Sequence, residues 1–191
     1  MSEAPGSSRR APGVARSENA ARRHAAIYGE GRVPAFERWK VEERLLAGRN
    51  PLSEVDVLEL RSVGVSHLLD LREETEWLGP GRFGREAIEA EERLRLRRRW
   101  LPIPDGAAPE PATLRRAADW LDTALAAREA IVFVHCRAGL ERTAAVLAAW
   151  IGRRDRRDLA GALASLRRFG YPGQPLAAQA EAVARFLRGD G

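Results

Sequence analysis

Lysine is almost absent from this chain of 191 residues. Lys40 is the only lysine among 32 basic residues, and the formal net charge is +5. A positive surface attracts anions of every kind by long-range electrostatics, so its sign alone does not select a nucleic acid. Charge therefore identifies no ligand here, and we predict no specific nucleic-acid partner.

Cysteine and long apolar runs are equally scarce. Cys136 is the only cysteine, which excludes an internal disulfide and gives no sign of an oxidising compartment. No apolar run approaches the roughly 18 residues of a membrane-spanning helix. Residues 1–15 also lack the apolar segment of a secretory signal. We expect no membrane span and a cytoplasmic location.

Large apolar residues are rare before Ile27. Residues 1–30 consist mainly of Ala, Arg, Ser, Gly and Pro. Such a segment buries too little apolar surface to offset the entropy of ordering it. We predict a mobile basic segment there, with a basic docking arm as the alternative. Residues 31–191 are long enough for one compact domain, and nothing in the sequence predicts an oligomeric state.

The rest of the chain alternates between strand and helix patterns. Ser53 and Gly64 bracket a helix as its N-cap and its terminating residue. We predict strands at 41–46, 65–71, 94–103 and 131–134, and helical segments at 53–61, 73–77, 86–93, 113–128, 142–153, 157–169 and 175–187. A Gly-Pro-Gly loop is expected at 79–81. This order predicts an α/β fold, a three-layer sandwich whose central, largely parallel sheet is flanked by helices. Ligands of such folds bind beyond the carboxyl ends of the strands.

The segment Val134-His-Cys-Arg-Ala-Gly-Leu-Glu-Arg-Thr143 lies at such a position. An apolar strand ends at His135, and a helix begins near Arg142. The intervening loop can curl so that successive backbone N–H groups converge on one point, with the positive end of the helix behind them. Gly139 permits the backbone angles of a tight curl. The sequence therefore predicts an anion cradle the size of a phosphate.

Two side chains of this loop carry chemistry. Arg142 can donate two parallel hydrogen bonds to phosphate oxygens, which a lysine cannot do. Cys136 lies at the centre of the cradle, where the positive surroundings favour its thiolate form, and a thiolate aimed at phosphorus is a competent nucleophile. A cysteine after an apolar run is otherwise an inert core residue. The arginine at the end of the loop, with His135 and Thr143 flanking, favours the catalytic interpretation.

His-Cys-x5-Arg-Thr after an apolar strand resembles the signature of the protein tyrosine phosphatase superfamily. Three further segments resemble its dual-specificity branch: Gly64 to Glu76, the acid loop Trp100-Leu-Pro-Ile-Pro-Asp105, and Gln179 in the last helix. The resemblance covers residues 39–188. It implies the cysteine-phosphatase fold and a catalytic domain at 31–191, after the segment 1–30.

The resemblance also implies a two-step mechanism without metal or cofactor. Cys136 attacks phosphorus to form a phosphocysteine while Asp105 protonates the leaving oxygen, and Asp105 then acts as base when water hydrolyses the intermediate. Thr143 is expected to donate its hydroxyl to the sulfur, and His135 to orient the loop. The residues expected around the phosphate are Arg137, Ala138, Gly139, Leu140, Glu141 and Arg142. Asp105 has an alternative interpretation as a turn former before Gly106, and His135 as a buried core histidine.

Glu141 departs from many dual-specificity enzymes, which carry a small residue or lysine there. It resembles the acidic residue of bacterial tyrosine and phosphoinositide phosphatases whose loop ends in Asp-Arg-Thr. We predict hydrolysis of phosphotyrosine, phosphoserine or phosphothreonine in proteins, with a phosphoinositide or another small phosphate monoester as the alternative. A phosphate-binding pseudoenzyme and a rhodanese-type sulfurtransferase are less favoured. The pseudoenzyme would lack the nucleophile or the acid, and the sulfurtransferase would not need Asp105.

Overall fold

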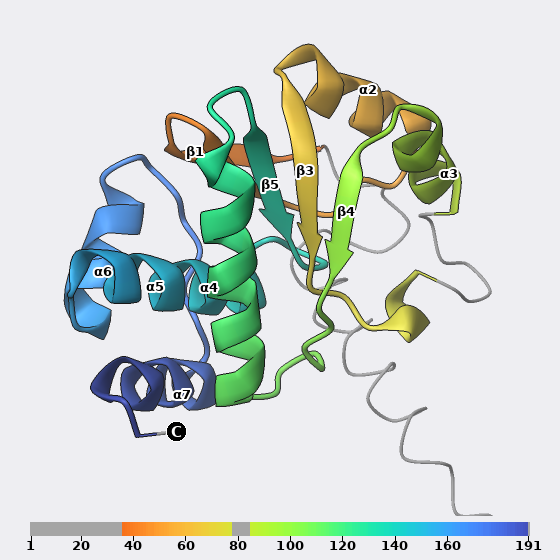
Figure 1. The fold of residues 1–191 in the computed structure, drawn as a ribbon. Coiled ribbons are helices and arrows are strands. Elements are labelled where there is room, and N and C mark those ends of the chain that lie inside the picture. The colour runs from red at the N-terminus through yellow and green to blue at the C-terminus, as the bar shows by residue number, and fades with distance from the viewer. Residues whose placement is uncertain (1–35, 78–84, 191) are drawn as a thin grey trace, which may run out of the picture. The chain divides into compact units, whose positions relative to one another are not determined.

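A computed structural model describes residues 36–77 and 85–190. The segment 1–30, the predicted domain boundary at residue 31 and the loop at 79–81 lie outside these residues. Within them, helices flank a five-stranded sheet with the strand order β1-β2-β5-β3-β4 (Figure 1). The strands are β1 (Arg38–Glu42), β2 (Leu45–Gly48), β3 (Val65–Asp70), β4 (Arg97–Trp100) and β5 (Ile131–His135). Only β1 and β2 pair antiparallel. The predicted α/β sandwich with a largely parallel sheet is confirmed.

The helices form one layer on each face of the sheet. They are α2 (Glu54–Ser62), α3 (Arg85–Arg93), α4 (Pro111–Ala126), α5 (Glu141–Asp155), α6 (Leu159–Arg167) and α7 (Ala177–Arg188), with the 3-10 turn η1 (Glu74–Glu76) after β3. One buried cluster joins the sheet to α4, α5, α6 and α7, and a second joins it to α2 and α3. No helix among residues 36–77 and 85–190 is long and apolar enough to cross a bilayer.

Helix α2 begins and ends close to where the sequence predicts. Ser53 is the N-cap, and its hydroxyl accepts a hydrogen bond from the Asp56 N–H at 3.4 Å. Gly64 follows the helix with φ 86°, a left-handed conformation that favours glycine. The chain can therefore turn directly into β3, where Leu68 and Leu69 are fully buried.

Two strand predictions are wrong in extent. The single strand expected at 41–46 comprises the end of β1, a turn at 43–44 and the start of β2, which pair as a hairpin. Arg44 occupies that turn, and its guanidinium donates to the Leu125 carbonyl at 3.0 Å and the Ala127 carbonyl at 2.7 Å, at the end of α4. The strand expected at 94–103 is confined to β4, because Arg95 before it has a φ of 56° that strands do not adopt.

Candidate active site

The Cys136 loop joins β5 to α5 at the carboxyl edge of the sheet. In the strand register Asp70, the last residue of β3, lies beside both His135 and Trp100, the last residues of β5 and β4. The connections that follow β3, β4 and β5 therefore leave the sheet at one level (Figure 1). These connections carry Glu76, Asp105 and Cys136, so the two predicted catalytic residues come to the same edge.

The curl of the loop depends on Gly139. Its φ is +73°, and a Cβ atom at this position would lie 2.0 Å from the carbonyl group of Gly48. The loop is also held from outside, since the Asn50 N–H donates to the Arg137 carbonyl at 3.2 Å. The Tyr171 hydroxyl donates to the Gly139 carbonyl at 2.6 Å. Any larger residue at 139 would push the loop away from Gly48, which is why the curl needs glycine.

The predicted nucleophile is buried, with 2% of Cys136 exposed. Thr143 follows in the first turn of α5, and its buried hydroxyl has no hydrogen-bond partner among the described residues. A buried donor without a partner is costly, so this hydroxyl is available for the sulfur or for a ligand. The role of Thr143 in releasing the sulfur remains a prediction.

Arg142 is held by Glu76, a residue to which sequence analysis assigned no role. Nη1 of Arg142 donates to Glu76 Oε2 at 2.6 Å, and Nη2 donates to Glu76 Oε1 at 2.7 Å. Burial alone would lower the pKa of Arg142, but the hydrogen bond to Glu76 and the nearby Cys136 raise it above its usual value. Arg142 therefore stays charged although only 2% of its side chain is exposed.

The contacts of Arg142 also show which of its donors remain for phosphate. Nη1 additionally donates to the Ile103 carbonyl at 3.1 Å, and Nη2 lies 3.4 Å from Asp105 Oδ1. Glu76 accepts from both Nη1 and Nη2, so the parallel bonds predicted for a phosphate would have to come from the Nε side of the guanidinium.

Asp105 lies on a loop that is docked against three parts of the fold. Its carboxylate faces Arg142, and its N–H donates to Glu73 Oε2 at 3.1 Å. Two residues further on, the Ala107 carbonyl accepts from Gln179 Nε2 at 3.2 Å. Gln179 is fully buried in α7, and its Oε1 accepts from the Leu176 N–H at 3.1 Å. Asp105 also lies in a turn, in which the Ala107 N–H donates to the Pro104 carbonyl at 3.0 Å. The loop thus brings Asp105 beside Arg142, and its role as the acid remains a prediction.

His135 is part of a buried charge network behind the loop. Its Nδ1 lies 3.3 Å from the Cys136 carbonyl and 3.7 Å from Asp70 Oδ1. Burial lowers the pKa of His135 to about 4, against the charge of Asp70, which raises it. Arg72 binds Asp70 through two hydrogen bonds, with Nε at 2.9 Å and Nη2 at 2.7 Å. A neutral, fully buried His135 beside the Cys136 carbonyl can orient the loop from behind.

The other predicted phosphate-binding residues belong to the Cys136 loop, and their contact with phosphate remains a prediction. Arg137, Ala138, Leu140 and Glu141 are half-buried, whereas Gly139 is buried. Glu141 is the first residue of α5, where a carboxylate is stabilised by the positive end of the helix. That local effect explains an acidic residue at this position without a catalytic role. Within the described residues, no group of three or more His, Cys, Asp or Glu side chains could hold a metal ion.

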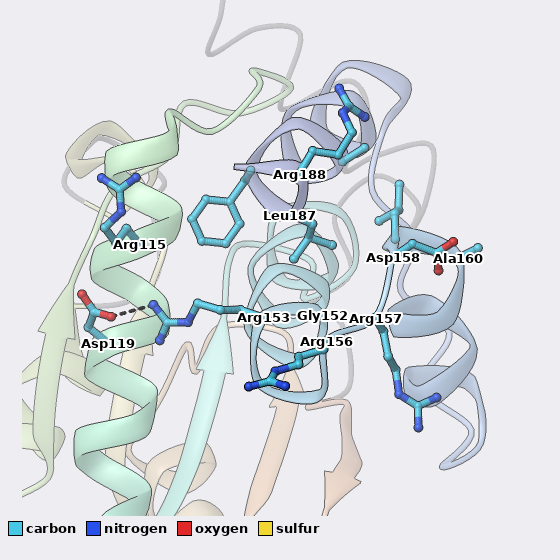
Figure 2. Close-up of a pocket in the computed structure, with 13 residues that line it drawn as sticks. Arg115, Asp119, Gly152, Arg153, Arg156, Arg157, Asp158, Ala160, Leu187 and Arg188 are labelled. Carbon is cyan, nitrogen blue, oxygen red and sulfur yellow. Dashed lines mark hydrogen bonds and ion pairs between the residues drawn. The ribbon is translucent and has the colours of Figure 1, made fainter. Parts of the chain in front are cut away.

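A pocket of about 960 Å³ lies at the other end of α5 (Figure 2). It is lined by Arg115 and Asp119 of α4, by the end of α5 and by residues of α6 and α7. Arg153 crosses it to bind Asp119 and Asp122, both at 2.6 Å. Since a helix rises about 1.5 Å per residue, this pocket is well separated from the Cys136 loop at the start of α5.

A family model described as "Polymorphic toxin system, DSP-PTPase phosphatase" matches residues 48–155, more than half of the chain. The chain belongs to this family. The match to the DSP-PTPase phosphatase model begins at the end of β2 and includes the acid loop, the Cys136 loop and α5. No curated protein sequence matches the chain significantly.

Solved structures of phosphatases share the fold of this family member. Tk-PTP in its active form is 22% identical with a TM-score of 0.67, over 79% of this chain and 96% of that chain. PTPMT1 in complex with PI(5)P is 19% identical with a TM-score of 0.66, over 80% and 95%. The kinase-associated phosphatase KAP, with its catalytic cysteine replaced by serine, is 18% identical with a TM-score of 0.67, over 84% and 97%. These similarities confirm the predicted cysteine-phosphatase fold.

Proposed function

We propose that this DSP-PTPase family member hydrolyses phosphate monoesters through a phosphocysteine, and that its substrates are phosphorylated proteins. The observation that carries the proposal is the meeting of three groups at one sheet edge. Cys136 lies in the anion cradle, Arg142 closes the loop, and Asp105 faces the Arg142 guanidinium at 3.4 Å. The chain carries residues suited to act as nucleophile and as acid, which disfavours a phosphate-binding pseudoenzyme.

In the first step the Cys136 thiolate attacks phosphorus and an S–P bond forms. The bond between phosphorus and the ester oxygen breaks, its electron pair stays on the leaving oxygen, and the Asp105 carboxyl supplies the proton. The loop amides and the free edge of Arg142 bind the remaining oxygens, whose negative charge they stabilise. Glu76 keeps the guanidinium in place throughout, so little reorganisation is needed.

In the second step water attacks the phosphocysteine. The Asp105 carboxylate takes a proton from this water, the S–P bond breaks, and the thiolate and inorganic phosphate are released. The unpartnered hydroxyl of Thr143 is suited to donate to the departing sulfur. The chemistry needs Cys136 reduced, which fits the cytoplasmic location that we propose.

The substrate class is tested with the purified full chain. Phosphate release is measured from peptides carrying phosphotyrosine, phosphoserine or phosphothreonine and from phosphoinositides in vesicles, with Cys136→Ser as the matched control. We expect turnover of the phosphopeptides that Cys136→Ser abolishes. Turnover of phosphoinositides alone would transfer the assignment to a lipid phosphatase. PTPMT1, which shares the fold, is known in complex with PI(5)P. No turnover of any ester would overturn the proposed function.

A further inference from the structure

Glu73 and the turn η1 that follows it connect two parts of the site that are far apart in the sequence. Glu73 contacts the acid loop, and Glu76 at the end of the turn contacts Arg142. Both glutamates come from the same short connection after β3. Both side chains belong to the capping box of this turn, and their contacts with Asp105 and Arg142 come in addition to it.

The contact of Glu73 is made with the backbone of the acid itself. The Asp105 N–H donates to Glu73 Oε2 at 3.1 Å. A carboxylate acceptor makes this bond stronger than one between neutral groups. The bond fixes the backbone at Asp105 and therefore the direction in which its carboxyl leaves the loop.

Glu73 is in turn held by Glu76. The Glu73 N–H donates to Glu76 Oε2 at 2.7 Å, and the Glu76 N–H donates to the Glu73 carbonyl at 3.0 Å. Glu76 Oε2 is the same atom that accepts from Arg142 at 2.6 Å. A chain of hydrogen bonds thus runs from Arg142 through Glu76 and Glu73 to the backbone of Asp105.

We propose that Glu73 is a positioning residue for the general acid. It holds the backbone of Asp105 in register with the phosphate-binding Arg142, so that the proton is delivered where the leaving oxygen emerges. The inference rests on the proposed function, because it gives Glu73 an effect only in the step that Asp105 performs. Glu73 itself touches neither the phosphate nor the nucleophile.

The test compares two substrates that differ only in their need for a proton. Glu73→Ala removes the acceptor, whereas Glu73→Gln keeps an oxygen that can accept from the Asp105 N–H. The matched control is Glu74→Ala, because Glu74 is an exposed neighbour in the same turn. For an aryl phosphate with a poor leaving group we expect kcat of Glu73→Ala to fall about 10- to 100-fold, the usual cost of a misplaced catalytic group.

For an activated aryl phosphate the same variant should lose roughly twofold or less, since that leaving group needs little protonation. Glu73→Gln should recover most of the loss, and Glu74→Ala should match the wild type. Equal losses on both substrates with Glu73→Ala and no recovery with Glu73→Gln would overturn the positioning role, because a turn that merely unfolds affects both reactions. The melting temperature of each variant shows whether the substitution has unfolded the turn.

A double variant gives an independent readout. If Glu73 acts through Asp105, then Glu73→Ala adds nothing to the loss caused by Asp105→Asn on the poor substrate. Additive losses would overturn the inference while leaving the proposed function intact, since Cys136-dependent turnover would persist. A wild-type protein without activity on either ester would instead overturn the proposed function on which the inference rests.

Discussion

At the scale of single residues, Cys136 makes the sharpest prediction. Cys136→Ser should lower kcat on an aryl phosphate by about 10⁴-fold or more, because a serine hydroxyl stays protonated near neutral pH and cannot act as this nucleophile. Binding of vanadate or sulfate should persist, since backbone amides and Arg142 make the cradle. Kinetics and anion titration measure the two properties separately. Undiminished turnover by the serine variant would rule out the covalent mechanism.

Arg142 provides a second prediction at this scale. Its guanidinium binds Glu76 with one edge and offers the other to phosphate, and a single ammonium group cannot do both. Arg142→Lys should therefore lower kcat/KM by about 10²- to 10³-fold, the loss typical of removing one donor to a developing charge. Arg137→Lys, elsewhere in the same loop, is the comparison. If Arg142→Lys instead kept the kcat/KM of the wild type, positive charge rather than the paired geometry would be what matters.

At the scale of elements, the connection between α6 and α7 shapes the Cys136 loop. Tyr171 in this connection is 1% exposed and donates to the Gly139 carbonyl at 2.6 Å. Gly173 leaves room for its ring, since a Cβ there would lie 2.3 Å from the tyrosine. A residue outside the motif thus fixes a carbonyl of the Cys136 loop.

Tyr171→Phe tests this support. The variant leaves a buried carbonyl without its donor, which should cost about 1–3 kcal/mol of stability. Because the curl of the loop loosens, inhibition by vanadate should weaken by roughly 10-fold, the effect of about 1.4 kcal/mol on binding. Trp39→Phe is the control, because Trp39 packs edge-on against the same ring. Lower stability with unchanged vanadate inhibition would limit Tyr171 to a packing role.

At the scale of the whole molecule, a buried group of charged side chains connects α3 to strand β4 of the sheet. Glu91 of α3 is 2% exposed, and neither of its carboxylate oxygens has a hydrogen-bond partner among the described residues. Arg98 Nε lies 3.5 Å from Glu91 Oε2. Burial raises the pKa of Glu91 to about 7 from 4.5, although Arg98 and Arg72 act in the opposite direction.

This shift predicts how stability depends on pH. Between about pH 4.5 and 7 the folded protein binds more protons at Glu91 than the unfolded chain, so this residue makes stability fall as pH rises through that window. Glu91→Gln cannot ionise, so its melting temperature relative to the wild type should rise across the window and level off above it. The lowered pKa of His135 changes the stability of both proteins at acid pH, so its contribution cancels when their melting temperatures are compared.

The control is Glu89→Gln, because Glu89 is exposed on the same helix. Its melting temperature should follow that of the wild type at every pH. If Glu91→Gln instead destabilises the protein increasingly as pH rises, the ionised carboxylate is stabilised by Arg98 and Arg72, and the pKa of Glu91 is lowered in the folded state.

The sequence by itself determined the parts of the molecule whose signals are contiguous. The apolar run of β5, the glycine of the loop and the start of α5 follow one another, so the strand, the curled loop and the helix could be predicted from local backbone requirements. The start and end of α2 could be predicted in the same way, because Ser53 and Gly64 lie next to the helix in the sequence. The extent of β1, β2 and β4 could not be predicted, because the turn at Arg44 depends on the distant end of α4.

Only the tertiary structure decided what holds the catalytic groups. Arg142 binds Glu76, which lies 66 positions away, and the Gly139 carbonyl is bound by Tyr171, 32 positions away. The chain contains 27 acidic residues, and the sequence does not show which of them meets a given arginine. The choice follows from burial, because a guanidinium or carbonyl removed from water needs a partner, and packing determines which partner is within reach.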